Sequence, residues 1–134
     1  MKRLLILFAA AAFLSGCARA SFVDDRDFDM YYMGISGIHP GETATSAPSY
    51  IGARPSEFEI YTISLNGNIY YNPKIDGKLN ENSSFFVDPS TGNFKLQNSS
   101  SLRTGRYAVG IKCRAAGKTY SYPEAVTIIM EKSN

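Results

Sequence analysis

The sequence has no tryptophan, one histidine and two cysteines among its 134 residues. Two cysteines, at positions 17 and 113, are too few for the framework of several disulfides that staples small secreted domains. The single histidine, His39, lies in the turn sequence Ile38-His39-Pro40-Gly41, with no cysteine or carboxylate at the spacing of a catalytic triad or metal site. Gly34-Ile35-Ser36-Gly37 lacks the Lys-Ser/Thr and helix of a phosphate-binding loop. We therefore expect neither an enzyme nor a resident metal or cofactor.

An excess of charge of one sign is also missing. The chain has 14 Lys and Arg against 12 Asp and Glu, and two of these cations, Lys2 and Arg3, precede the first apolar run. Without them the formal net charge is zero. This balance gives no electrostatic reason to expect nucleic acid or an anionic surface as a partner.

No apolar run is long enough to cross a membrane. The longest, residues 4–13, has about half of the roughly 20 residues that a spanning helix needs. It follows the cationic start Met1-Lys2-Arg3 and precedes small residues, which is the order of a secretory signal. Its end, Leu14-Ser15-Gly16-Cys17, resembles the lipobox of bacterial lipoproteins. The resemblance implies a signal peptide over residues 1–16, its removal, and a covalent lipid on Cys17 that attaches the chain to a bilayer. A cut after Ala18-Arg19-Ala20 is the alternative.

Residues 17–29 are predicted to form the acylated cysteine and a flexible acidic tether. They show no sustained period, and they contain four aspartates, Asp24, Asp25, Asp27 and Asp29. Clustered carboxylates suit calcium, but the glycine turn and distal glutamate of an EF-hand loop are missing, which favours a solvated spacer.

Residues 30–134 are predicted to form one all-β domain. Strand patterns occupy residues 30–33, 48–51 and 57–65, whereas residues 34–47 are rich in turn formers. The apolar phase of residues 57–65 shifts near Tyr61-Thr62, which predicts a β-bulge. Asn66-Gly67 predicts a hairpin with a return strand over residues 68–71. No amphipathic helix is indicated.

The second half of the domain contains the clearest hairpin. Phe85 and Val87 would share a face with Phe94 and Leu96, across a turn in which Asp88 binds amides and Gly92 supplies a positive φ. Two long strands follow, over residues 106–114 and 118–130, the second broken at Pro123. On the first of them the alternation predicts that Cys113 is a buried structural thiol. Short strands spaced by turns predict an antiparallel sandwich of about seven strands.

Two motifs in this half carry a family resemblance. Residues 85–94 resemble the F-x-I-D-x-x-T-G-x-I segment of cadherin-like and putative immunoglobulin-like (Ig-like) bacterial domains, and residues 102–109 resemble their L-x-x-G-x-Y-x-V segment. Over residues 45–131 the chain is similar to the membrane-proximal Ig-like domain of Bacteroidetes surface glycan-binding lipoproteins. The resemblance implies a lipid-anchored protein of the bacterial outer membrane or cell surface. It carries no calcium site, because residues 96–102 lack the acids of calcium-dependent cadherins.

Tyrosine pairs are the candidate ligand-binding residues. Sugar sites use aromatic rings on which C–H faces stack, and the candidates are Tyr31 and Tyr32, Tyr70 and Tyr71, and Tyr120 and Tyr122, with Asn72 and Glu124 as polar neighbours. Tyrosine is also a favoured strand residue that packs at sheet edges. Two roles therefore stay open: a non-catalytic module that binds polysaccharide, or a structural or adhesive spacer that docks a surface protein, for example at a sheet edge.

Overall fold

The computed structural model describes residues 28–73, 77 and 79–133. The predicted signal peptide, Cys17 and the acidic cluster up to Asp27 lie outside the described residues. Within the part that is described, no helix is long and apolar enough to cross a membrane.

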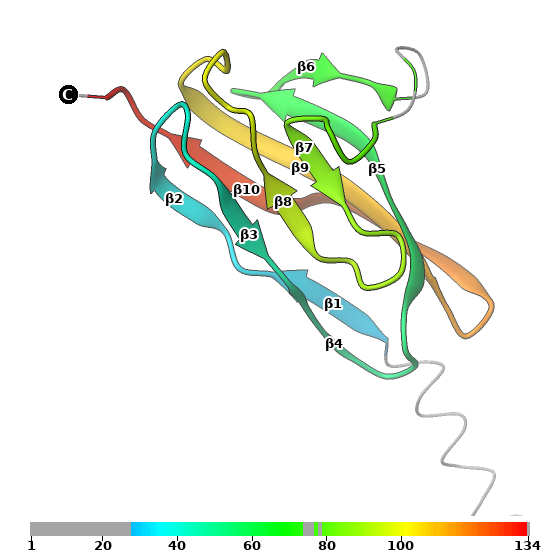
Figure 1. Ribbon diagram of the computed structural model, residues 1–134. Helices are drawn as coiled ribbons and strands as arrows, with labels where there is room; N and C mark the ends of the chain where they lie inside the picture. The colour runs from blue at the N-terminus through cyan, green and yellow to red at the C-terminus, as the bar shows by residue number, and fades with distance from the viewer. Residues whose placement is uncertain (1–27, 74–76, 78, 134) are drawn as a thin grey trace, which may run out of the picture.

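The described chain folds into a sandwich of short strands (Figure 1). A five-stranded sheet has the order β2-β10-β9-β5-β6, and the facing layer combines the sheet β3-β8-β7 with the pair β1-β4. The strands are β1 (Asp29–Tyr32), β2 (Ile35–Ile38), β3 (Ala44–Ser46), β4 (Pro48–Ile51), β5 (Ser56–Leu65), β6 (Asn68–Tyr71), β7 (Phe85–Val87), β8 (Phe94–Leu96), β9 (Gly105–Ala115) and β10 (Lys118–Met130). The predicted all-β Ig-like sandwich is confirmed.

Ten strands are described where about seven were expected, because the turn-rich segment 34–47 contains β2 and β3. The expectation of turns without strands over residues 34–47 was wrong. β2 runs parallel to β10 and has only four residues, of which the first and the last, Ile35 and Ile38, are buried. Such a strand is too short to show an alternating pattern in the sequence. The chain therefore changes layer between β1 and β2.

The core lies between the two layers and is built by alternation. On β9, Tyr107, Val109, Ile111 and Cys113 are all buried, as the period-two pattern predicted. On β5 the pairing with β9 shifts between Ile60 and Thr62, which confirms the predicted bulge. The bulge puts Phe58, Ile60, Ile63 and Leu65 into the same core despite their opposite parities.

The predicted hairpins form with the expected backbone. Asn66 and Gly67 both have positive φ, 52° and 87°, between β5 and β6. In the turn between β7 and β8 the Asp88 carboxylate accepts hydrogen bonds from the amides of Ser90 and Thr91, at 2.8 and 3.1 Å. Gly92 has a φ of 79°, and the ring of Phe58 lies where a β-carbon would point. Asp88 is therefore a turn former.

Two residues that were predicted to belong to the tether pack on the sandwich. Phe28 is buried and its ring centroid lies 4.6 Å from that of Tyr120, while Asp29 opens β1. Phe28 was not expected in the core, because a single aromatic residue after an acidic run gives no periodic signal.

Candidate ligand-binding surfaces

Tyr70 and Tyr71 are half-buried on β6, at one edge of the five-stranded sheet. The Tyr70 ring packs edge-on against Tyr107, with centroids 5.4 Å apart, and the Arg103 guanidinium lies 6.0 Å from its centroid. The Tyr71 hydroxyl donates to the carbonyl oxygen of Gly77 at 3.1 Å. Both rings pack against the core cluster, so their faces are largely covered.

Tyr120 and Tyr122 lie on β10, opposite the buried residues Cys113 and Ile111 of β9, so both side chains point toward the facing layer. Tyr120 contacts Phe28. Burial raises the pKa of Tyr122 to about 12, together with the nearby Asp29 carboxylate, with which it forms a hydrogen bond. Through these contacts with Phe28 and Asp29, the two tyrosines hold the start of β1 against β10.

The two tyrosine pairs do not form one platform. In the sheet order β2-β10-β9-β5-β6, two strands separate β10 from β6. Of the remaining candidate rings, Tyr32 is buried and its hydroxyl donates to the carbonyl oxygen of Gly92 at 2.6 Å, whereas Tyr31 is 63% exposed.

β10 is one continuous strand, and its pairing with β9 shifts between Tyr122 and Val126 instead of breaking at Pro123 as predicted. A hollow of about 460 Å³ lies between β1 and this part of β10, beside the second pair. Its lining includes Tyr31, Tyr122 and Glu124. Glu124 is held in an ion pair with Arg106 at 3.0 Å. The hollow thus combines aromatic rings with a phenol and a carboxylate, the groups that bind sugar hydroxyls.

The described residues show no group of metal-ligating side chains. His39 lies in a turn, where its Nδ1 is 3.0 Å from the carbonyl oxygen of Glu131 and its backbone amide donates to the Glu42 carboxylate. Burial raises the pKa of the Cys113 thiol, which keeps it protonated. The histidine joins the ends of β2 and β10, and the thiol is a core group, as predicted.

Sequence reasoning missed a cluster of exposed apolar side chains on the pair β1-β4. Among the described residues five large apolar side chains are exposed, and four of them, Tyr31, Met33, Tyr50 and Ile51, belong to this pair or follow it directly. The fifth, Ile69, lies on β6. Tyr31 and Ile51 are on the face opposite to the buried Met30 and Tyr32. The signal was present in the sequence, since apolar residues at consecutive positions cannot all point into one core.

Comparison with known proteins decides the family. Residues 15–134 match the family described as "Surface glycan binding protein BT4661-like, N-terminal". The chain belongs to this family. The description of the family names surface glycan binding.

Among solved structures, the chain is similar to BT4661, a SusE-like surface located polysaccharide binding protein from the heparin utilisation locus of Bacteroides thetaiotaomicron. The two are 29% identical, with a TM-score of 0.62, over 76% of this chain and 16% of BT4661. The chain therefore spans about a sixth of that protein.

Two further structures resemble the domain more distantly. A twitchin kinase fragment of C. elegans with immunoglobulin domains is 9% identical over 83% of this chain and 22% of its own, with a TM-score of 0.45. Human titin ZIg10 is 15% identical over 81% of this chain and 79% of its own, with a TM-score of 0.39. Among curated proteins, no match was found.

Proposed function

We propose that the protein is a lipoprotein of the bacterial outer membrane or cell surface, attached through Cys17, whose Ig-like domain is a non-catalytic module in glycan capture. The lipobox-like sequence Leu14-Ser15-Gly16-Cys17 directly behind a short apolar run supports the anchor. The family of N-terminal domains of surface glycan binding proteins supports the setting.

Within that setting, the geometry best supports the role of a membrane-proximal arm. The described chain enters the sandwich at the start of β1 and leaves it after β10 at the opposite end (Figure 1). A domain with its two ends so placed puts the length of the sandwich between the anchored end and the far end. This placement of the ends is the observation that carries the proposal, and the continuous core gives the arm its rigidity.

The anchor is tested by the substitution Cys17→Ser in the full chain. The unchanged protein is expected in the membrane fraction, and the variant is expected to be lost from it. The control is Cys113→Ala, which removes the other cysteine and should leave the protein in the membrane fraction. Retention of Cys17→Ser in the membrane would refute the anchor.

Direct glycan contact is the second candidate role, and the hollow beside Tyr122 favours it. Affinity electrophoresis in gels containing polysaccharide separates the two roles. If the domain is only an arm, the protein should migrate as it does in gels without polysaccharide. If the domain binds glycan directly, its migration should be retarded.

The tyrosine pairs serve as controls for each other in that experiment. If Tyr120 and Tyr122 bind sugar, the variant Tyr120→Ala/Tyr122→Ala loses the retardation and Tyr70→Ala/Tyr71→Ala keeps it; the reverse result assigns the site to β6. Thermal unfolding of each variant shows whether a loss comes from the ring or from the fold. Absence of retardation for the wild type by every polysaccharide refutes direct contact and leaves the arm.

A further inference from the structure

The exposed apolar side chains are concentrated at one place in the domain. Tyr31, Met33 and Ile51 are 63%, 71% and 62% exposed, and all three lie on β1 or β4 or directly after β1. In the register of this pair Tyr31 is opposite Ser49 and Ile51 is opposite Asp29, so Tyr31 and Ile51 are on the same outer face, whereas the Asp29 carboxylate forms a hydrogen bond with Tyr122. We call Tyr31, Met33 and Ile51 the apolar face.

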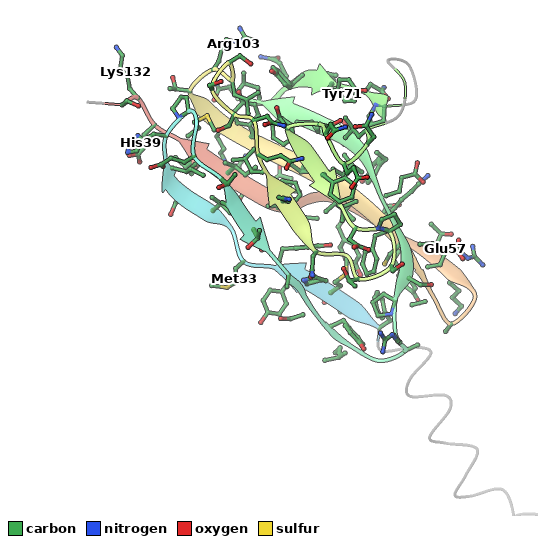
Figure 2. The ribbon with its side chains drawn as sticks, in the orientation of Figure 1. Met33, His39, Glu57, Tyr71, Arg103 and Lys132 are labelled. Carbon is green, nitrogen blue, oxygen red and sulfur yellow. The ribbon has the colours of Figure 1, made fainter. Side chains whose placement is uncertain are left out.

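The face is unlike the rest of the described surface. Elsewhere among the described residues, Ile69 is the remaining large apolar side chain with comparable exposure, and it lies alone on β6. Figure 2 shows Met33 and Tyr71, whose strand carries Ile69, on opposite sides of the domain. Clustered exposed apolar groups mark contact sites, whereas isolated ones are ordinary.

The position of the face in the chain indicates its occupant. The described residues begin at the buried Phe28, directly before β1, and the eleven residue steps back to Cys17 would span at most about 40 Å when extended. As a flexible linker they would keep the two ends about 20 Å apart on average. A lipid on Cys17 would therefore hold β1 and β4 within reach of the bilayer surface.

The chemistry of the face suits that surface. Tyrosine is enriched where lipid headgroups meet water, because its ring is apolar and its hydroxyl is polar, and aliphatic side chains insert into the boundary of the acyl chains. The chain has no net charge after residue 16, so the contact would depend on apolar burial and not on anionic lipid.

We infer that the apolar face formed by Tyr31, Met33 and Ile51 is a membrane-contact surface that lies on the lipid headgroup region when Cys17 is acylated. This inference rests on the proposed lipid anchor. The inference adds an orientation to the proposed anchor: β1 and β4 face the bilayer. The lipid and the apolar face then together hold the protein at the membrane.

The absence of tryptophan makes a direct test available. The variant Ile51→Trp puts a single tryptophan on the apolar face, and Ile69→Trp puts one at an equally exposed position on β6. Each lipidated full chain is purified from membranes and reconstituted into phosphatidylcholine vesicles, with and without brominated acyl chains. Flotation of the vesicles reports the anchor independently of the fluorescence.

The inference predicts a blue-shifted emission and quenching by brominated lipid for Ile51→Trp, and neither for Ile69→Trp. Protein that floats with the vesicles while Ile51→Trp stays unquenched overturns the membrane contact and leaves the anchor intact. Equal quenching of both variants also overturns it, because the domain then has no preferred face. Failure of both variants to float overturns the anchor and this inference with it.

A second copy of the chain is the competing occupant. In that case the emission of Ile51→Trp would shift with the density of protein in unbrominated vesicles, which contradicts the inference. Met33→Trp, at a neighbouring exposed position, repeats the test if Ile51→Trp does not fold.

Discussion

The hydroxyl of Tyr107 donates a 2.7 Å hydrogen bond to the carbonyl oxygen of Arg103, four residues earlier in the chain. The bond ties the start of β9 to the loop before it, in the arrangement called a tyrosine corner in Ig-like sandwiches. The Tyr107 side chain is fully buried and packs against Phe85 of β7, with centroids 5.4 Å apart. One residue therefore links the two layers and fixes the entry of β9.

Tyr107→Phe keeps the ring and removes the hydrogen bond. We expect a loss of about 1 kcal/mol in the free energy of unfolding, because the Arg103 carbonyl loses its donor. Urea unfolding followed by circular dichroism measures it. Tyr31→Phe, which changes an exposed hydroxyl, is the control and should change nothing; equal stability of both variants would contradict the role of the corner.

Gly92→Ala and Gly117→Ala form a matched pair, since the φ angles of the two glycines are 79° and 78°. A β-carbon on Gly117 meets nothing within 4 Å, whereas one on Gly92 would lie 2.6 Å from the Phe58 ring. Gly117→Ala should cost about 1–2 kcal/mol from the left-handed backbone alone. Gly92→Ala should cost about 1–3 kcal/mol more, from overpacking.

The same urea unfolding measurement compares the two glycine variants. Equal losses would mean that the β7–β8 turn moves away from Phe58 at no cost, which contradicts the packing described for this hairpin.

The raised pKa of Tyr122 predicts that the domain loses stability at high pH. Its pKa is about 12 in the folded protein and about 10 in an unfolded chain, so between these values the folded state binds more protons. Stability from this group is full below pH 10 and is lost as the pH rises toward 12.

Urea unfolding at pH 9 and pH 11 measures this effect. Tyr122→Phe should lose less stability over this range than the wild type, and Asp29→Asn should lower the pKa of Tyr122, because it removes the carboxylate. An unchanged pH dependence in Tyr122→Phe would assign the loss to other groups.

Cys113 should be unreactive in the folded domain. The side chain is buried, so a reagent cannot reach the sulfur. Burial also raises the pKa of the thiol, so little of it is present as the reactive thiolate. In the Cys17→Ser variant, where Cys113 is the remaining cysteine, a thiol reagent at pH 8 should react after unfolding in denaturant and not before it. Prompt reaction of the native protein would contradict its place in the core.

The fold was predictable where a pattern was long enough to be read. β9 and β10 alternate over many residues, and Asn66-Gly67 and Asp88-Pro89-Ser90-Thr91-Gly92 fix their turns through local chemistry. β2 and β3 were missed, because strands of three or four residues in a glycine-rich segment are fixed by partners distant in sequence, β10 and β8. Short strands carry little local signal.

The candidate site was less predictable than the fold. Tyrosine content and spacing identified rings that belong to strands, but whether a ring faces solvent depends on what packs on it. Phe28 covers Tyr120, and Tyr107 lies against Tyr70, and neither contact follows from the local sequence. The assignment of sugar contact to Tyr70, Tyr71, Tyr120 or Tyr122 stays a prediction for the gel experiment.

The central claim is that the chain is held at the membrane by a lipid on Cys17, and the mass of the mature N-terminus tests it most directly. The account predicts that mass spectrometry of the membrane-derived protein finds residues 1–16 removed and Cys17 as the first residue, carrying the mass of its acyl chains. A mature chain that starts at Ser21, after a cut behind Ala20, would lack Cys17 altogether and would contradict the claim.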